Sequence, residues 1–198
     1  MIVKVCGMRD ADNIRAVEQL GVDWLGFIFW PRSSRYVAAP PAYLPERARR
    51  VGVFVDADIE EIKRTATAFQ LDIIQLHGSE SPDVAAQLRD WKVIKALNIA
   101  TPADLQVTAS YEGLVDYFLL DTKGPSVGGN GTQFDWRVLD AYQGPTPFLL
   151  SGGIGPDDAA RIRSFRHPRL AGIDLNSRFE LSPALKDIQK LTTFLTQL

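Results

Sequence analysis

Eight short apolar runs recur at similar intervals along the chain, and this repetition constrains the fold more than any other feature. The runs are Ile2–Cys6, Trp24–Phe29, Val51–Val55, Asp72–Leu76, Val93–Leu97, Val115–Asp121, Pro147–Ser151 and Ala171–Leu175. Segments with helical periodicity separate them. Strands that alternate with helices pair in parallel, because a parallel connection needs a crossover. The nearly continuous apolar character of each run is typical of a strand covered on both faces.

Two architectures consist of such repeats, a closed (β/α)8 barrel and an open doubly wound sheet. Eight evenly repeated units in a chain of 198 residues favour the closed barrel and leave no room for a second domain. We therefore predict an α/β fold in which residues 1–198 form a single-domain (β/α)8 TIM barrel. In that fold the active site lies at the carboxyl ends of the strands, so the residues after each run are the functional candidates.

Capping residues predict where the helices begin. Asp10 caps a first helix that Gly21 ends, and a capping residue followed by proline marks four further starts. These four are Ser81-Pro82, Thr101-Pro102, Gly155-Pro156 and Ser182-Pro183. Apolar periodicity predicts helices from Ile59 to Phe69 and from Leu185 to Leu195, and Pro40-Pro41 predicts the entry to a short second helix.

Composition and charge exclude several classes of function. The net charge of −2 gives no support for binding to nucleic acid or to a membrane surface. The sequence has no signal-peptide pattern and no apolar run long enough to span a bilayer, so we expect a cytoplasmic enzyme. One cysteine excludes an internal disulfide and a multi-cysteine zinc site, and with only two histidines beside it we expect no metal.

Two proton carriers end apolar runs. Cys6 ends the first run, where a thiol would point into the barrel mouth and could act as a base or nucleophile if nearby positive charge lowered its pKa. The alternative is a small buried residue that only ends a strand. Asp121 ends the sixth run and could act as a general acid, or it could be a helix cap or loop anchor.

Polar residues after two other runs suggest contacts with a ligand. Arg32 and Arg35 share the loop after the second run, where either guanidinium could grip a carboxylate or phosphate or could simply be solvated. His77 follows the fourth run and could be an acid–base group. We interpret His77 as a hydrogen-bonding wall of the substrate pocket, because Cys6 and Asp121 already supply two proton carriers.

Glycine-containing turns follow the last strands. The segment Gly128–Gly131 lies in the longest expected loop, from Thr122 to Gln133. Ser151–Ile154 and Asp174–Ser177 follow the seventh and eighth runs, which is where this fold usually binds phosphate through backbone N–H groups near a helix N-terminus. No Gly-Lys-Ser/Thr sequence follows any of these turns, so none is a nucleotide P-loop.

Several segments, taken in order, carry a resemblance to a known family. They are Lys4-Val5-Cys6-Gly7-Met8, Gly26-Phe27-Ile28-Phe29, Ser34-Arg35-Tyr36, Val51-Gly52-Val53-Phe54-Val55, Gln75-Leu76-His77-Gly78, Leu119-Leu120-Asp121, Gly128-Gly129-Asn130-Gly131-Thr132, Phe134-Asp135-Trp136, Leu150-Ser151-Gly152-Gly153-Ile154 and Gly172-Ile173-Asp174-Leu175-Asn176-Ser177. The chain resembles the phosphoribosylanthranilate isomerases from residue 2 to about residue 190.

The resemblance implies an isomerase of tryptophan biosynthesis, and so of aromatic amino-acid biosynthesis. This enzyme converts N-(5-phosphoribosyl)anthranilate into 1-(2-carboxyphenylamino)-1-deoxyribulose 5-phosphate by an Amadori rearrangement. By this resemblance Asp121 is the general acid that opens the furanose ring, and Cys6 is the general base that takes the proton from C2′. No metal and no organic cofactor is implied.

The resemblance also implies the substrate contacts. Arg35 would hold the anthranilate carboxylate and Asp174 would touch a sugar hydroxyl. The phosphate would bind to the backbone around Gly152, Gly153, Asn176 and Ser177. The expected partner is therefore a small phosphosugar-anthranilate, with no nucleic acid or membrane, and a monomer is favoured over a homodimer.

This chain departs from the family pattern near the expected phosphate site. The family usually has Ser-Gly-Val-Glu where this chain has Ser177–Glu180, and Pro-Gly where it has Pro183-Ala184. Arg178 thus replaces a glycine beside an expected dianion. Two other interpretations remain: another phosphosugar barrel enzyme, such as a ribulose-phosphate epimerase or indole-glycerol-phosphate synthase, and a non-catalytic phosphate-binding module.

Overall fold

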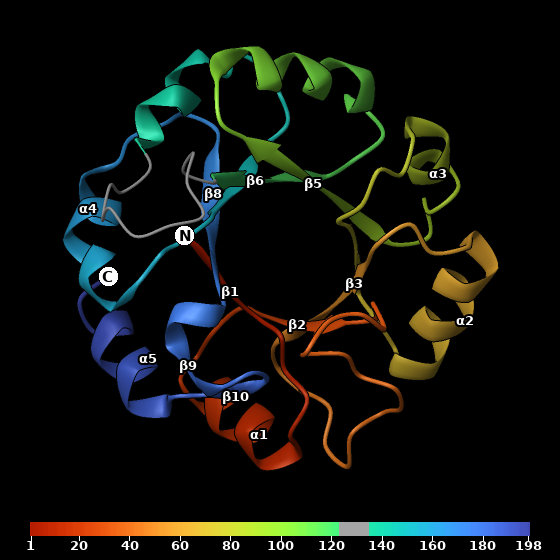
Figure 1. Cartoon of the computed structure of the whole chain (residues 1–198), viewed down its shortest axis with the longest axis vertical. Helices are drawn as coiled ribbons and strands as arrows, with labels where there is room; N and C mark the ends of the chain where they lie inside the picture. Colours follow the sequence, from red (N-terminus) through yellow and green to blue (C-terminus); the bar gives the residue numbers. More distant parts are fainter. Residues whose placement is uncertain (123–134) are drawn as a thin grey trace.

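The structure of the protein, a computed structural model, describes residues 1–122 and 135–198. Eight parallel strands pair in sequence order and close into a barrel, and Figure 1 shows this ring from one end with the helices outside it. The strands are β1 (Ile2–Cys6), β2 (Trp24–Ile28), β3 (Arg49–Phe54), β4 (Ile73–Leu76), β5 (Lys92–Ile99), β6 (Tyr117–Thr122), β7 (Phe148–Ser151) and β8 (Leu170–Leu175). The predicted closed barrel is confirmed, and each predicted run overlaps with one strand.

Short helices connect most of the strands. The α-helices are α1 (Ala11–Gln19), α2 (Ile59–Phe69), α3 (Pro82–Ala86), α4 (Ala159–Ser164) and α5 (Ile188–Leu195). The 3-10 helices are η1 (Pro102–Tyr111), η2 (Trp136–Ala141), η3 (Pro156–Asp158) and η4 (Ser177–Phe179). Asp10 caps α1 as predicted, because its carboxylate accepts a hydrogen bond of 2.8 Å from the backbone N–H of Asn13. Within the described residues, no helix combines the length and apolar character needed to cross a membrane.

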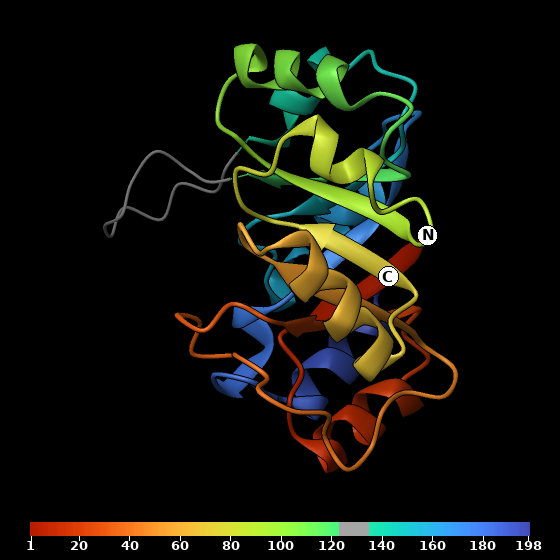
Figure 2. The same cartoon turned by 90° about the vertical axis from the view of Figure 1, so that its right-hand side faces the viewer.

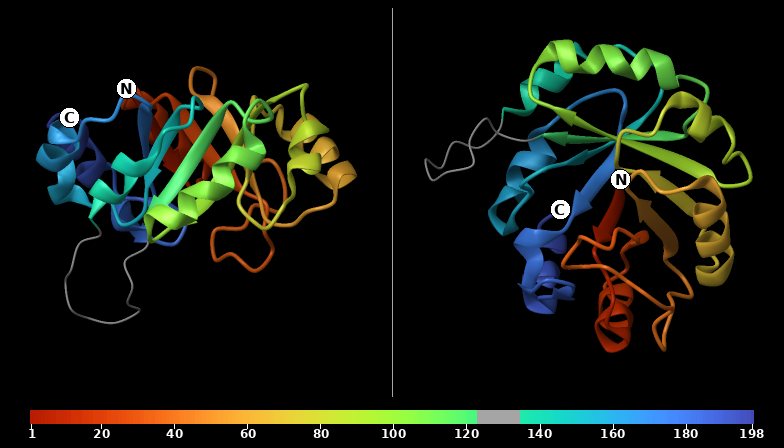
Figure 3. Two further views of the ribbon diagram at one scale, coloured as in Figure 1. Left: turned by 90° about the horizontal axis from the view of Figure 1, so that it is seen from above. Right: turned by 45° about the vertical axis from the view of Figure 1, so that its right-hand side comes forward.

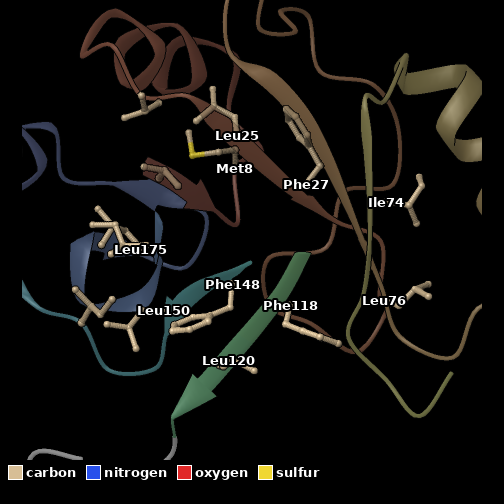
Figure 4. Packing of buried hydrophobic residues seen from close by; sticks show 14 of the residues in the cluster. Met8, Leu25, Phe27, Ile74, Leu76, Phe118, Leu120, Phe148, Leu150 and Leu175 are labelled. Carbon is tan, nitrogen blue, oxygen red and sulfur yellow. The ribbon is translucent and has the colours of Figure 1, made fainter. Parts of the chain in front are cut away.

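The apolar core has two layers, one on each side of the strands. The inner layer fills the barrel and consists of Trp24, Val51, Ile73, Ile94, Ala96, Leu119 and Leu149. The outer layer lies between strands and helices, and Figure 4 shows Phe118 and Leu120 of β6 beside Phe148 and Leu150 of β7, to which they are paired. Burial on both faces is why the strands read as continuous apolar runs in the sequence.

The prediction that Ser182-Pro183 begins a helix is wrong. Ser182 ends strand β9 (Glu180–Ser182), which forms a two-stranded antiparallel hairpin with β10 (Leu185–Lys186), and α5 begins only at Ile188. Asn13 of α1 fixes the hairpin through two hydrogen bonds of 2.9 and 2.7 Å with the backbone of Lys186. These tertiary bonds outweigh the local helix-start signal, and Figure 1 shows the hairpin between α1 and α5.

The prediction of a short helix at Pro40-Pro41 is also wrong, because residues 29–48 form an extended connection without a helix. A buried carboxylate organises this connection. Glu18 of α1 accepts backbone N–H bonds from Arg47 and Ala48, at 2.7 and 2.9 Å, and a hydrogen bond from the Tyr43 hydroxyl. One helix side chain thus supplies the backbone partners that a helix in the loop would have supplied itself.

The two ends of the barrel differ in what they present. Figure 2 and the left view of Figure 3 show both chain termini at the end opposite the carboxyl ends of the strands. The loops that follow the strands therefore gather at the end away from the termini. The predicted loop Thr122–Gln133, with Gly128–Gly131, lies outside the described residues apart from its first residue.

The seam between β1 and β8 yields a stability prediction. Gly172 pairs with Ile2, and a Cβ on Gly172 would lie 2.2 Å from the Ile2 carbonyl oxygen, a backbone atom that cannot move without opening the seam. We expect Gly172→Ala to lower the free energy of unfolding by roughly 1–3 kcal/mol, the usual cost of overpacking. Urea unfolding measures this. Gly155→Ala is the control, because its Cβ would meet nothing nearer than 3.7 Å; equal losses in both variants would contradict the prediction.

Candidate active site

The interior face of the barrel changes from apolar to polar toward the carboxyl end. Side chains alternate along a strand, so Lys4 and Cys6 share the inward face with Ile2, and Asp121 shares it with Leu119. Parallel strands bring their carboxyl ends to one edge of the barrel. The structure therefore places Cys6 and Asp121, from β1 and β6, at the same end and on the inner face, as the sequence predicted.

Cys6 is held in a tight space beside charged groups. Its side chain is only 4% exposed, and Gly26 on the neighbouring strand makes room for it, since a Cβ there would lie 2.8 Å from the Cys6 sulfur. Burial raises the pKa of the Cys6 thiol, while the charges of Lys4 and Lys186 oppose that rise. The reactivity of the thiol thus depends on a balance between burial and neighbouring cations.

An ion pair lies one layer below the thiol. The Lys4 ammonium is 2.7 Å from the Asp174 carboxylate, and both side chains are buried. The Ser151 hydroxyl approaches the other oxygen of Asp174, at 3.4 Å. Ser151 is paired in turn with Asp121 across β6 and β7. The polar side chains of β1, β7 and β8 are therefore in contact at the bottom of the site, and Asp121 lies on the next strand beside Ser151.

Arg35 lies in an ion-pair cluster that the sequence did not predict. Its Nε donates to one Glu180 oxygen at 2.9 Å and its Nη2 to the other at 2.6 Å. Lys186, only 1% exposed, donates to Glu180 at 2.6 Å and to the Asn176 side-chain oxygen at 2.8 Å. The bond to Glu180 raises the pKa of Arg35, whereas burial lowers the pKa of Lys186. Burial opposes ionisation of Glu180, but bonds from both cations keep its pKa below its ordinary value.

Gly7 makes this cluster possible. It adopts a φ of +79°, in the left-handed region that favours glycine. A Cβ on Gly7 would lie 2.6 Å from Cδ of Arg35 and 2.9 Å from the side-chain oxygen of Asn176. Any larger residue after Cys6 would displace both groups. The glycine thus brings Arg35 and Asn176 against the backbone that carries the thiol.

Two loops after β7 and β8 form the candidate phosphate site. Gly152 and Gly153 have φ values of +97° and +65°, and a Cβ on Gly153 would meet nothing within 4 Å. Ser177 is exposed and begins the turn η4. Arg178 is also exposed, and its Cβ and Cγ lie 4.0 Å from the position of a Cβ on Gly155. The backbone at Gly153 is therefore open, and the side chain of Arg178 starts beside the neighbouring Gly155.

His77 follows β4 and is half-buried. The Gln75 amide nitrogen lies 2.7 Å from Nδ1 of His77. Gln75 itself is fully buried, and its side-chain oxygen has no hydrogen-bond partner among the described residues. The sequence did not single out Gln75, because a glutamine between apolar residues carries no signal of its contacts. The contact between Gln75 and His77 places His77 at the wall of the barrel mouth.

The structure brings the predicted site residues to one end of the barrel and adds others. Sequence reasoning missed Glu180 and Lys186, because it placed Lys186 in a helix. The predicted Gly128–Gly131 turn lies outside the described residues. Within residues 1–122 and 135–198, no group of three or more His, Cys, Asp or Glu side chains is arranged to hold a metal ion.

Known proteins share both the sequence and this architecture. The family model described as N-(5′phosphoribosyl)anthranilate (PRA) isomerase matches residues 3–197. A protein of Phocaeicola vulgatus named N-(5′-phosphoribosyl)anthranilate isomerase is 52% identical over 200 residues, which is 100% of this chain and 98% of the relative.

Solved structures agree with the sequence comparison. The crystal structure of phosphoribosyl anthranilate isomerase from Thermus thermophilus matches with a TM-score of 0.85 and 31% identity, over 100% of this chain and 98% of that one. Another, of phosphoribosyl anthranilate isomerase in complex with reduced 1-(o-carboxyphenylamino)-1-deoxyribulose 5-phosphate, matches with a TM-score of 0.82 and 28% identity over the same shares. The chain therefore belongs to the N-(5′-phosphoribosyl)anthranilate isomerase family.

Proposed function

We propose that this protein catalyses the Amadori rearrangement of N-(5-phosphoribosyl)anthranilate to 1-(2-carboxyphenylamino)-1-deoxyribulose 5-phosphate in tryptophan biosynthesis. The observation that carries the proposal is the placement of Cys6 and Asp121 on the inner face of one barrel end, in a chain of this family. The reaction needs an acid and a base near one sugar, and this end of the barrel supplies both. The substrate carries an anion at each end, and Arg35 and the glycine loops flank the same site.

Asp121 and Cys6 divide the proton transfers. Asp121 donates a proton to the ring oxygen, the bond from C1′ to that oxygen breaks, and a Schiff base forms. Cys6 then removes the proton from C2′, and the electron pair moves to form the C1′=C2′ bond of an enolamine. Loss of the C2′ hydroxyl proton and gain of a proton at C1′ give the ketone. Substrate and product are isomers, so no redox partner is consumed.

The remaining residues hold the two charged ends of the substrate. Glu180 occupies the Nε–Nη2 edge of Arg35, which leaves the Nη1–Nη2 edge to bind the anthranilate carboxylate. The phosphate binds to the backbone of the loops after β7 and β8, at Gly152, Gly153, Asn176 and Ser177. Asp174 contacts a sugar hydroxyl from below, and His77 lines the pocket.

The other expectations stay part of the proposal. We propose one barrel domain across residues 1–198, a cytoplasmic location, no cofactor and a monomer in solution. Light scattering of the purified protein tests the last of these.

The proposed reaction can be followed directly. We expect the anthranilate fluorescence of freshly made substrate to decay when the purified protein is added, because the rearrangement changes the group attached to the aromatic amine. The substrate also decomposes on its own, so the control is the doubly substituted protein Cys6→Ala, Asp121→Asn. Decay that is no faster with the natural protein than with the control would overturn the proposed function.

The acid and base assignments make separate predictions. We expect Cys6→Ala and Asp121→Asn each to lower kcat by at least ~10²-fold, the usual contribution of a positioned acid or base. Single-turnover kinetics measure this, and circular dichroism shows whether the fold is kept. Near-normal turnover in a folded variant would remove that residue from its role.

Arg35 should act on binding more than on chemistry. A charge-assisted hydrogen bond contributes roughly 1.5–3 kcal/mol, so Arg35→Ala should raise KM about 10- to 150-fold. Arg32→Ala is the matched control, because Arg32 is exposed in the same loop. If Arg32→Ala weakens binding more than Arg35→Ala, the carboxylate site has been assigned to the wrong arginine.

The exposed Arg178 tests the phosphate site. A guanidinium at the start of a helical turn adds charge to the backbone donors, so Arg178→Gly should weaken binding of the phosphorylated product. The loss should shrink at high salt, where screening already weakens the charge interaction. Calorimetric titration at two salt concentrations measures both effects. Unchanged affinity at low salt would mean that the side chain turns to solvent and contributes only its backbone.

A further inference from the structure

Lys4 carries a buried charge, and the proposed mechanism assigns it no role. Its side chain is 0% exposed and points into the barrel from the middle of β1, two residues before Cys6. Burying an ammonium is costly even when it is paired, and an apolar residue of similar volume often serves stability as well. Its ion pair with Asp174 makes the burial possible but does not explain why the strand carries a lysine there.

The groups around Cys6 show what the charge does. Lys4, Lys186 and Arg35 interact electrostatically with the thiol, and Lys4 lies on the same inward face of β1, two residues before it. The carboxylates in the same cluster are Asp174, paired with Lys4, and Glu180, paired with both Lys186 and Arg35. Three cations and two carboxylates leave one positive charge uncompensated. A thiolate at Cys6 would balance these five charges, and Asp121, the further carboxylate at this end of the barrel, lies on β6.

Lys4 differs from Lys186 and Arg35 in its carboxylate partner. Glu180 lies within 2.6 Å of both Lys186 and Arg35, and it holds both on the hairpin side of the site. Lys4 faces Asp174 in the barrel interior and shares the inward face of its own strand with Cys6. The ammonium is therefore fixed by a carboxylate on the face of the strand that carries the sulfur, with no solvent to screen its charge.

We propose that Lys4, fixed by Asp174, is the positioning residue whose charge offsets the burial of the Cys6 sulfur and favours its ionised, proton-accepting form. The inference rests on the proposed function, in which Cys6 is the base. Burial raises the pKa of the thiol and Lys4 is the first of the groups that oppose this rise, whereas Asp174 adds to it. Without Lys4 the buried thiol would be still harder to ionise, and removal of the proton from C2′ would slow.

The charges predict pKa changes of opposite sign in two variants. Lys4→Met removes the cation and should raise the pKa of Cys6 by about 1–3 units, the usual effect of one nearby charge. Asp174→Asn removes the competing anion, leaves Lys4 to pair with the sulfur, and should lower that pKa. Lys4→Arg keeps a cation and should restore part of the shift. A merely structural role of Lys4 predicts none of these changes.

Cys6 is the only cysteine in the chain, so its ionisation can be measured directly. The thiolate absorbance near 240 nm is recorded against pH for each folded variant, with Cys6→Ala as the baseline. Lys95→Met is the matched control, because Lys95 is equally buried and pairs with Glu80 at 2.8 Å, but faces away from the barrel interior. The control should leave the titration of Cys6 unchanged.

The outcomes distinguish the inferred role of Lys4 from the proposed function of the protein. The inference is supported if the pKa of the thiol is higher in Lys4→Met and lower in Asp174→Asn. It also requires that kcat/KM rises at a higher pH in Lys4→Met than in the natural protein. An unchanged titration in folded Lys4→Met overturns it. If Lys4→Met does not fold, Asp174→Asn decides, and an unchanged or higher pKa there overturns the inference. The titration needs no substrate, so failure of the natural protein to convert substrate would overturn only the proposed function.

Discussion

The pairing of β1 with β8 is the contact on which the rest of the structure depends. It closes the barrel and sets Lys4 opposite Asp174, so that residues 170 positions apart form a buried ion pair. A slip of one strand by one residue would turn one of the two charges toward the apolar outer layer and leave the other unpaired, because side chains alternate along a strand. The pair therefore stabilises the correct register and carries the charge that lies below Cys6. Closure and chemistry depend on the same seam.

The part of the site that would bind the anionic groups of the substrate is completed by a hairpin that is not part of the barrel repeat. Strands β9 and β10 bring Glu180 and Lys186 against Arg35, which belongs to the loop after β2. This cluster lies beside Asn176, where the candidate phosphate loop begins. Parts of the site that would hold the carboxylate and the phosphate are thus joined by direct hydrogen bonds. The hairpin gives both ends of the site a common support.

The sequence predicted most of the fold because the fold depends on simple periodic burial. Each apolar run became one strand, and Asp10 and the Ile59–Phe69 segment were assigned correctly, since caps and apolar stripes act within a few residues. The failures at Pro40-Pro41 and Ser182-Pro183 have a common cause. In both places a side chain from α1, Glu18 or Asn13, binds the backbone of the distant segment and overrides its local preference.

The sequence alone determined the number and order of the strands, the inward position of Cys6 and Asp121, and the family pattern, because these follow from spacing along one chain. Only the tertiary structure decided that Lys4 faces Asp174, and that Glu180 binds both Arg35 and Lys186. Such contacts join residues from different strands and from the hairpin. The charge on a buried group depends on these neighbours in space, and no local pattern along the sequence records them.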